Sequence, residues 1–397
     1  MLPLSRKVVS LQPSQTLLLF NRAKQMVLSG IDVISLTAGE PDFPTPQQVK
    51  NGAVRAIEEN FTKYTPNQGI PKLLMAIAEK FKKDNRLHFE PSQILVSNGA
   101  KHSVYNALQA ICNRGDEVII PAPYWVSYPE MAKLVDAKPV IVKTSPANQF
   151  KMTASQLKKA ITKKTKLLIH CSPSNPTGAV YSIDETAELA RVIARTGIYV
   201  ISDEIYEKIL YDGAEHHSIG SIEAIRDQVV TVNGVSKAYS MTGWRIGFMG
   251  AHKSIVAAAE KFQGQMTSNA SSISQRAALE ALTTDLQAEL GLMVGEFDRR
   301  RRFFKGELEK LGIQFIEPKG AFYLFFNVKP FLKKSADGAK IKTADELCEY
   351  LLTRHHVAMV PGEGFGAPDW IRASYACSMN ELEKAAERLH AGFKALK

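Results

Sequence analysis

Residues 229–250 read VVTVNGVSKAYSMTGWRIGFMG, a segment in which two apolar runs enclose a group of polar residues. Both runs, 229–234 and 245–250, are apolar without alternation, which is typical of strands buried on both faces of an α/β sheet. Lys237 follows the first run, where little room is left for solvent, and desolvation lowers the pKa of an amine and makes it nucleophilic. A lysine at a strand end more often reaches solvent, so the functional prediction depends on the whole segment 236–247.

Apolar runs of the same kind recur along the middle of the chain, at 93–97, 117–122, 139–143, 166–172 and 198–204. Segments with helical periodicity, such as 102–112 and 184–196, separate several of them, as in α/β domains. After about residue 290 the pattern changes, and a helix over 287–311 precedes a mixture of strands and helices.

This change predicts two domains. We expect a large α/β domain at 46–290 and a smaller α+β domain at 291–397, which residues 1–45 join as an N-terminal arm. The chain has 397 residues, and single cores stop growing near about 250–300 residues, which also favours two domains.

The composition excludes several classes of protein. Apolar residues make up 45% and charged residues 23% of the chain, so it is neither disordered, fibrous nor a coiled coil. No apolar run approaches the roughly 18 residues of a membrane helix, and we expect no signal peptide. The four cysteines form no CxxC pair and lack a neighbouring histidine at metal-ligand spacing, so we expect reduced thiols in the cytoplasm and no metal site.

The net charge of +10 raises the question of nucleic-acid binding. The densest basic run is Arg299 to Arg302, and Phe297, Phe304 and Leu308 recur around it at helical spacing. We therefore predict that this run lies on the solvated face of a helix, and we expect no nucleic-acid partner.

The segment from Ser236 to Gly247 resembles the lysine motif of class I pyridoxal-phosphate (PLP) aminotransferases, S-K-x-x-x-x-x-G-x-R-x-G. The resemblance extends from about Ser10 to the C-terminus and is closest to bacterial aspartate aminotransferases of the Iβ type. It implies PLP fold type I, with a mostly parallel seven-stranded sheet in the large domain. It also implies a homodimer with shared active sites, in which Lys237 is the catalytic residue and binds PLP as a Schiff base.

Polar residues at strand ends are the candidates for binding the cofactor ring. Asp203 ends an apolar run, where ligands gather in open α/β sheets, although a strand-end aspartate often only caps a turn. The resemblance implies that Asp203 pairs with the protonated pyridine nitrogen, and that Asn175 and Tyr206 bind the ring hydroxyl. It makes Trp125 the aromatic residue that stacks on the ring.

Residues 97–101 end a strand and open a helix, and the free N–H groups of a helix N-terminus bind phosphate well. An ordinary strand–helix turn has the same appearance. The resemblance implies that the PLP phosphate is bound by Gly99, Ala100, Lys101, Ser236 and Arg245. It also implies that Tyr64 reaches the phosphate of the partner subunit.

The resemblance assigns the substrate side as well. Arg372 binds the α-carboxylate through its planar guanidinium group, assisted by the amide of Gly39, and the other residues on this side are Trp125, Asn175 and Thr16. Lys101 binds the distal carboxylate of aspartate or glutamate. A different subgroup uses an arginine of the partner subunit for that carboxylate, and the counterpart segment 267–272 contains none.

The resemblance therefore implies transamination between L-aspartate and 2-oxoglutarate. An aromatic or broad-specificity aminotransferase, including one that accepts prephenate, is the alternative, and a PLP β-lyase is a more distant one. Relatives that accept prephenate tend to carry a basic residue at the position of Gln12, which argues against prephenate. We also considered a transcription regulator, for which the chain leaves no room for a DNA-binding domain, and a nicotinamide enzyme, for which no GxGxxG motif follows an early strand.

Overall fold

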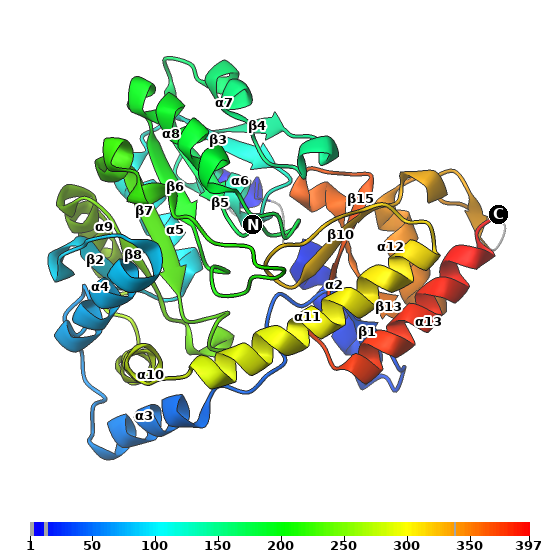
Figure 1. Cartoon of the computed structure of the whole chain (residues 1–397), viewed down its shortest axis with the longest axis horizontal. Helices are drawn as coiled ribbons and strands as arrows, with labels where there is room; N and C mark the ends of the chain where they lie inside the picture. The colour runs from blue at the N-terminus through cyan, green and yellow to red at the C-terminus, as the bar shows by residue number, and fades with distance from the viewer. Residues whose placement is uncertain (1–3, 12–14, 337–338) are drawn as a thin grey trace.

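A seven-stranded sheet forms the centre of the larger part of the computed structural model, which describes residues 4–11, 15–336 and 339–397 (Figure 1). Its strand order is β2-β8-β7-β6-β5-β3-β4. All neighbouring pairs are parallel except those of β8, which runs antiparallel to both β2 and β7. The bounds of its strands are β2 (Ile94–Ser97), β3 (Glu117–Ala122), β4 (Lys138–Lys143), β5 (Thr165–Cys171), β6 (Tyr199–Asp203), β7 (Val229–Gly234) and β8 (Gly247–Gly250).

Helices cover both faces of this sheet, which explains why its strands are apolar without alternation. Leu167 and Ile169 of β5 pack among α5, α6 and α9, whereas Leu168 between them packs on the opposite face against α8. A third group, α3, α4 and α10, packs against β2 and β8. The bounds of these helices are α3 (Gln47–Glu58), α4 (Pro71–Asn85), α5 (Ala100–Ile111), α6 (Ser127–Leu134), α7 (Ala154–Ala160), α8 (Ile183–Thr196), α9 (Lys253–Met266) and α10 (Ser272–Thr283).

The smaller part of the molecule contains a four-stranded antiparallel sheet of order β14-β15-β10-β9. The long helix α11 (Gln287–Lys310) extends from beside α10 to α13 and joins the two parts (Figure 1). The remaining elements are β9 (Phe315–Ile316), β10 (Tyr323–Asn327), β11 (Ser335–Ala336), β12 (Ala339–Lys340), α12 (Ala344–His355), β13 (Val357–Ala358), β14 (Val360–Pro361), β15 (Trp370–Ser374) and α13 (Met379–Ala395). The predicted combination of an α/β part and a smaller α+β part is therefore confirmed.

The N-terminal residues contact both parts. α1 (Arg6–Val9) lies against α6 of the larger part, where Lys7 pairs with Asp136 at 2.7 Å. α2 (Gln15–Leu28) and β1 (Ile34–Ser35) belong with the smaller part, because β1 pairs in parallel with β13. The domain boundaries at 45/46 and 290/291 stay a prediction.

The prediction that the arginine run Arg299–Arg302 lies on a solvated face is wrong for its two central members. Arg299 and Arg302 are exposed, but Arg300 is 5% exposed and Arg301 only 1%. Successive residues of an α-helix point about 100° apart, so four consecutive arginines cannot share one face. The two buried guanidinium groups are paired with five carboxylates, namely Asp42 and Glu296 for Arg300, and Asp212, Asp298 and Glu317 for Arg301.

None of the helices in the described ranges combines the length with the apolar content that crossing a membrane requires.

Candidate active site

A cavity of about 410 Å3 opens at the carboxyl ends of the parallel strands, where the two parts of the molecule meet. Asp203 and Cys171 reach it from the ends of β6 and β5, and Lys237 from the segment after β7. Arg372 and Tyr323 reach it from strands of the smaller sheet. The residues predicted from the sequence that line this cavity are Gly39, Ala100, Lys101, Trp125, Asn175, Asp203, Tyr206, Ser236, Lys237, Arg245 and Arg372.

Lys237 has the most strongly altered amine of the cavity. Its pKa is lowered to about 8, mainly by burial and also by the charges of Arg245 and Arg372. The charges of Glu40 and Asp203 oppose this effect. The Nζ atom donates a hydrogen bond to the carbonyl oxygen of Gly39 and lies 5.8 Å from the ring centre of Tyr206. An amine with a pKa near neutrality is available as a nucleophile and as a proton acceptor.

Asp203 is a buried carboxylate with two hydrogen-bond donors. Tyr128 donates to Oδ2 at 2.7 Å, and the backbone N–H of Ile205 donates to Oδ1 at 3.3 Å. Burial raises the pKa of Asp203, whereas both donors lower it because they stabilise the ionised form. The carboxylate therefore offers a cationic ring nitrogen a partner that is already oriented.

The N-terminus of α5 faces the cavity and is packed closely around two glycines. Gly99 is the N-cap with φ of 89°, and a Cβ there would lie 2.4 Å from Nη2 of Arg245. A Cβ on Gly247 would lie 2.1 Å from the backbone nitrogen of Ala100, so a side chain is excluded there as well. The first N–H groups of a helix have no partner within it, and with the Arg245 guanidinium they form an anion-binding site.

Arg372 is 2% exposed, and its guanidinium group is only partly satisfied. Nη1 donates to Oδ1 of Asn175 at 3.0 Å and Nη2 to the carbonyl oxygen of Thr37 at 2.8 Å. Its Nε is buried without a hydrogen-bond partner, and within the described ranges no carboxylate pairs with the group. A buried cation in this state is costly, which favours the binding of an anionic group from solution.

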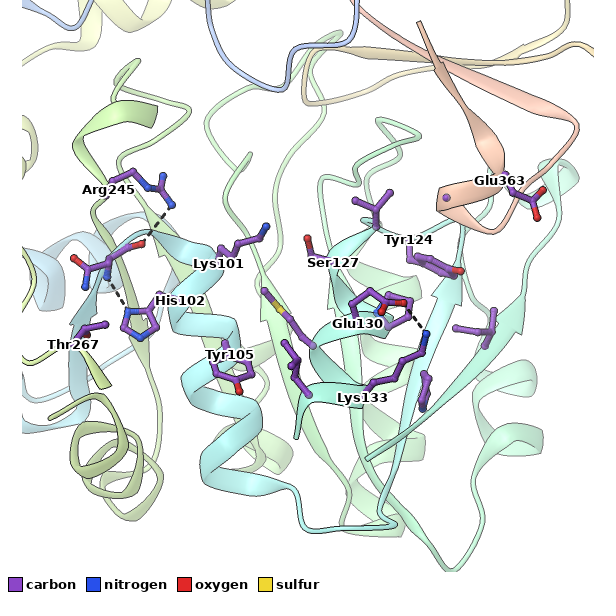
Figure 2. A pocket seen from close by; sticks show the side chains of 18 residues that line it. Lys101, His102, Tyr105, Tyr124, Ser127, Glu130, Lys133, Arg245, Thr267 and Glu363 are labelled. Carbon is purple, nitrogen blue, oxygen red and sulfur yellow. Dashed lines mark hydrogen bonds and ion pairs between the residues drawn. The ribbon is translucent and has the colours of Figure 1, made fainter. Parts of the chain in front are cut away.

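Lys101 lies between the 410 Å3 cavity and a wider neighbouring cavity of about 960 Å3. Figure 2 shows this second cavity, with Lys101, His102 and Tyr105 reaching it from α5. The Nζ atom of Lys101 lies 5.1 Å from the ring centre of Trp125. Burial lowers the pKa of Lys101, and the nearby charge of Arg245 lowers it further.

Two of the predicted residues whose side chains the structure describes, Gly99 and Tyr64, lie outside the lining of the active-site cavity. Gly99 lies directly behind it, against Arg245. Tyr64 is 92% exposed and borders a surface groove next to α9. Thr16 belongs to α2, but its side chain lies outside the described part of the structure, as does Gln12.

Sequence reasoning missed several residues that line the cavity. Tyr128 donates to Asp203, and Tyr323 contacts both Tyr206 and Arg372. Tyr128 lies three residues after the predicted Trp125, in the first turn of α6, and its ring packs edge to face against that of Trp125. Tyr323 follows the bend at Lys319 and is succeeded by the apolar residues 324–326 of β10, so no local signal distinguishes it from core.

One group of side chains near Asp203 has the spacing of metal ligands, namely Glu204, Glu207 and His216. Its carboxylates already have donors. His216 Nε2 lies 2.9 Å from Glu204, Asn85 donates to both glutamates, and Lys80 pairs with Glu207. These partners account for the buried charges without a metal ion.

A family model described as "Aminotransferase class I and II" matches residues 31–389. The chain belongs to this family. Members of the family are PLP-dependent aminotransferases. The family assignment confirms the resemblance of the lysine motif to class I enzymes.

Relatives of this aminotransferase match it over almost its full length. An aspartate aminotransferase from Bacillus sp. (strain YM-2) is 46% identical over 97% of this chain and 98% of that protein. A bifunctional aspartate aminotransferase and glutamate/aspartate-prephenate aminotransferase from Petunia hybrida is 46% identical over 99% of this chain and 83% of that protein.

Solved structures also match this chain over almost its full length. The aspartate aminotransferase from Rhizobium meliloti superposes with a TM-score of 0.96 at 41% identity, covering 100% of both chains. The enzyme from Thermus thermophilus, solved with maleate, superposes with a TM-score of 0.93 at 40% identity, covering 99% of this chain and 100% of that one.

Proposed function

We propose that this aminotransferase transfers the amino group of L-aspartate to 2-oxoglutarate and forms oxaloacetate and L-glutamate. The observation that carries the proposal is the presence of two cations, Arg372 and Lys101, in the lining of one cavity together with the amine of Lys237. A dicarboxylic amino acid needs two such partners, one for each carboxylate. The names of the relatives from Bacillus and Rhizobium agree with this substrate.

The residues of the cavity fit PLP as the cofactor. The helix N-terminus at Ala100 and Lys101 suits its phosphate, together with Gly99, Ser236 and Arg245. Asp203 suits its pyridine nitrogen, Asn175 and Tyr206 suit its ring hydroxyl, and Trp125 provides a stacking surface. When bound, PLP supplies the electron sink that takes up the charge left by breaking the Cα–H bond of the substrate.

The residues of this chain supply binding, orientation and proton transfer. Arg372 holds the α-carboxylate, with Gly39, Asn175 and Trp125 around it, and Lys101 holds the distal carboxylate. This arrangement fixes the direction of the substrate Cα–H bond. The Nζ atom of Lys237 would take the proton from Cα of the substrate and deliver it to the C4′ carbon of the cofactor. A pKa near 8 permits both steps. Thr16 remains a proposed residue of the substrate side.

The test of this function is a coupled assay of amino transfer. We expect oxaloacetate to form from L-aspartate and 2-oxoglutarate, and to be detected through its reduction by malate dehydrogenase. An enzyme that transfers the amino group of phenylalanine faster than that of aspartate would contradict the proposed substrate. Release of pyruvate from cystathionine would indicate a β-lyase instead.

A broad or prephenate-accepting specificity is the second candidate. It is supported by the names of the relatives from Petunia hybrida and from Rickettsia conorii, the latter a probable aspartate/prephenate aminotransferase. Assays with prephenate as the amino acceptor distinguish the two candidates.

We propose a homodimer, in which Tyr64 completes the active site of the partner subunit. A tyrosine that is 92% exposed on a monomer is available for such a contact. The 960 Å3 cavity beside Lys101 and Arg245 provides space for it (Figure 2). We further propose a cytoplasmic location, which the four free cysteines support.

Lys101→Gln should lower kcat/KM for aspartate by roughly 10- to 100-fold, because a hydrogen bond to a charged group is worth about 1.5–3 kcal/mol. The value for phenylalanine should change less than about threefold, since that substrate has no distal carboxylate. Steady-state kinetics with both donors measure this. Lys133→Gln is the matched control, because it removes a lysine that borders only the wider cavity and pairs with Glu130. An equal loss for both donors would contradict the role of Lys101.

Tyr128→Phe should raise the pKa of Asp203, because burial already raises it and the tyrosine hydroxyl opposes this effect. A carboxylate whose pKa rises loses its charge at a higher pH. The acid limb of the profile of kcat/KM against pH should therefore move upward by roughly one unit. Tyr375→Phe removes another buried hydroxyl, outside the cavity, and should leave the profile unchanged. If the pH profile of Tyr128→Phe coincided with that of the unaltered protein, an effect of Tyr128 on the pKa of Asp203 would be excluded.

A further inference from the structure

Tyr323 begins β10 and is fully buried at the wall of the active-site cavity. It lies opposite Ser374 in the antiparallel pair of β10 and β15. Arg372 is two residues from Ser374 along the same strand, so its side chain is on the same face and is a diagonal neighbour of Tyr323. The guanidinium carbon of Arg372 accordingly lies 4.5 Å from the centre of the Tyr323 ring.

The hydroxyl of Tyr323 lies 2.7 Å from that of Tyr206. The two rings form an edge-to-face pair with centres 5.8 Å apart. Both tyrosine side chains are buried. Tyr323 is thus in contact with the proposed partner of the cofactor hydroxyl on one side and with the proposed partner of the substrate α-carboxylate on the other.

The number of available protons determines which of the two tyrosines donates in this hydrogen bond. Each tyrosine hydroxyl has one proton to donate. If Tyr206 donates its proton to the ring hydroxyl oxygen of PLP, as proposed above, then Tyr323 must be the donor in the contact between the two tyrosines. A donor becomes stronger as it becomes more acidic. Burial raises the pKa of Tyr323, and the charge of Arg372 opposes this effect by lowering the pKa.

We propose that Tyr323 is a positioning residue that couples the substrate α-carboxylate site at Arg372 to the cofactor hydroxyl through Tyr206. A carboxylate bound at Arg372 compensates the cation, Tyr323 then donates less strongly to Tyr206, and Tyr206 donates less strongly to the cofactor oxygen. This inference rests on the proposed function and adds a residue to it.

Few other charges face the pair of tyrosines. Cys171, at the end of β5, influences both tyrosines electrostatically, and its thiol stays neutral because burial raises its pKa to about 12. Lys237 lies over the ring of Tyr206 at 5.8 Å. Arg372 is therefore the charged group in contact with Tyr323 whose charge a substrate carboxylate neutralises.

The test is a pH titration of the visible absorption spectrum of the PLP holoenzyme, with and without succinate, a dicarboxylate that has no amino group to transfer. A hydrogen bond from Tyr206 to the ring hydroxyl oxygen of PLP withdraws negative charge from that oxygen. This charge would otherwise stabilise the protonated nitrogen of Lys237. Tyr323→Phe keeps the ring over Arg372 but removes the donor. It should raise the pKa of the spectral transition by roughly half a unit to one unit, and should reduce the shift that succinate causes by a similar amount.

Tyr211→Phe is the control, because it removes a buried hydroxyl that donates to the carbonyl oxygen of Ala321, outside the cavity. Tyr211→Phe should change neither the pKa of the spectral transition nor the shift that succinate causes. In a Tyr206→Phe background, Tyr323→Phe should produce no further shift. An unchanged pKa in Tyr323→Phe, or an undiminished shift in the Tyr206→Phe background, would overturn the coupling.

If Tyr323→Phe does not fold, Tyr206→Phe alone tests the same link, because it must lose the same part of the succinate effect. A full succinate effect in that variant would overturn the coupling. Failure of the unaltered chain to bind PLP is a different result, which refutes the proposed function itself.

Discussion

Lys237→Ala should lower the rate of transamination by at least about 10⁴-fold, while the protein still folds. The amine of Lys237 has a pKa lowered to about 8 and lies inside the cavity, in the segment that follows β7. Its loss removes the nucleophile and the proton carrier together. Single-turnover measurements with PLP-loaded protein give the size of the effect.

Lys158→Ala is the matched control for this variant, because Lys158 is exposed on α7, away from the cavity. It should retain the full rate. Thermal unfolding of both variants checks that the loss of rate does not come from unfolding. Normal turnover by Lys237→Ala would refute the assigned role of this lysine.

Arg372→Lys should lower kcat/KM for aspartate by roughly 30- to 5,000-fold, because truncating one partner of a buried charged pair costs about 2–5 kcal/mol. Lysine keeps the charge, but it cannot bind a carboxylate with two parallel N–H groups. It also leaves Oδ1 of Asn175 and the carbonyl oxygen of Thr37 without the donors they have in the native chain.

The phosphate-binding residues do not include Arg372, so PLP content should stay close to that of the unaltered protein. Arg299→Lys is the control, since it exchanges an exposed arginine of α11 that pairs only with Glu296 within the described ranges. If Arg372→Lys retained PLP and also kept kcat/KM within about twofold, the α-carboxylate would have to bind elsewhere.

Much of the larger sheet could be predicted, because its strands are buried on both faces. Such strands appear in the sequence as short apolar runs, and the seven predicted runs correspond to the seven strands with ends displaced by a residue or two. α4 begins at Pro71, where the missing N–H of proline costs nothing because a first helical position has no partner for it within the helix.

The cavity residues were predictable where a motif identifies them, as for Lys237, Asp203 and Arg245. Tyr323 was not, because the three residues that follow it in β10 are buried and apolar, and only the pairing of β10 with β15 brings it to Arg372. The burial of Arg301 was missed for a similar reason. Its partners Asp212 and Glu317 come from other segments, and sequence periodicity contains no information about them.

The central claim is that Lys237 binds PLP in a cavity shaped for a dicarboxylic amino acid. The most direct measurement is the visible absorption spectrum of the purified protein supplied with PLP, before and after the addition of L-aspartate. We predict a visible band from the lysine-bound cofactor that fades when aspartate is added. The absence of such a band after PLP has been added would contradict the claim.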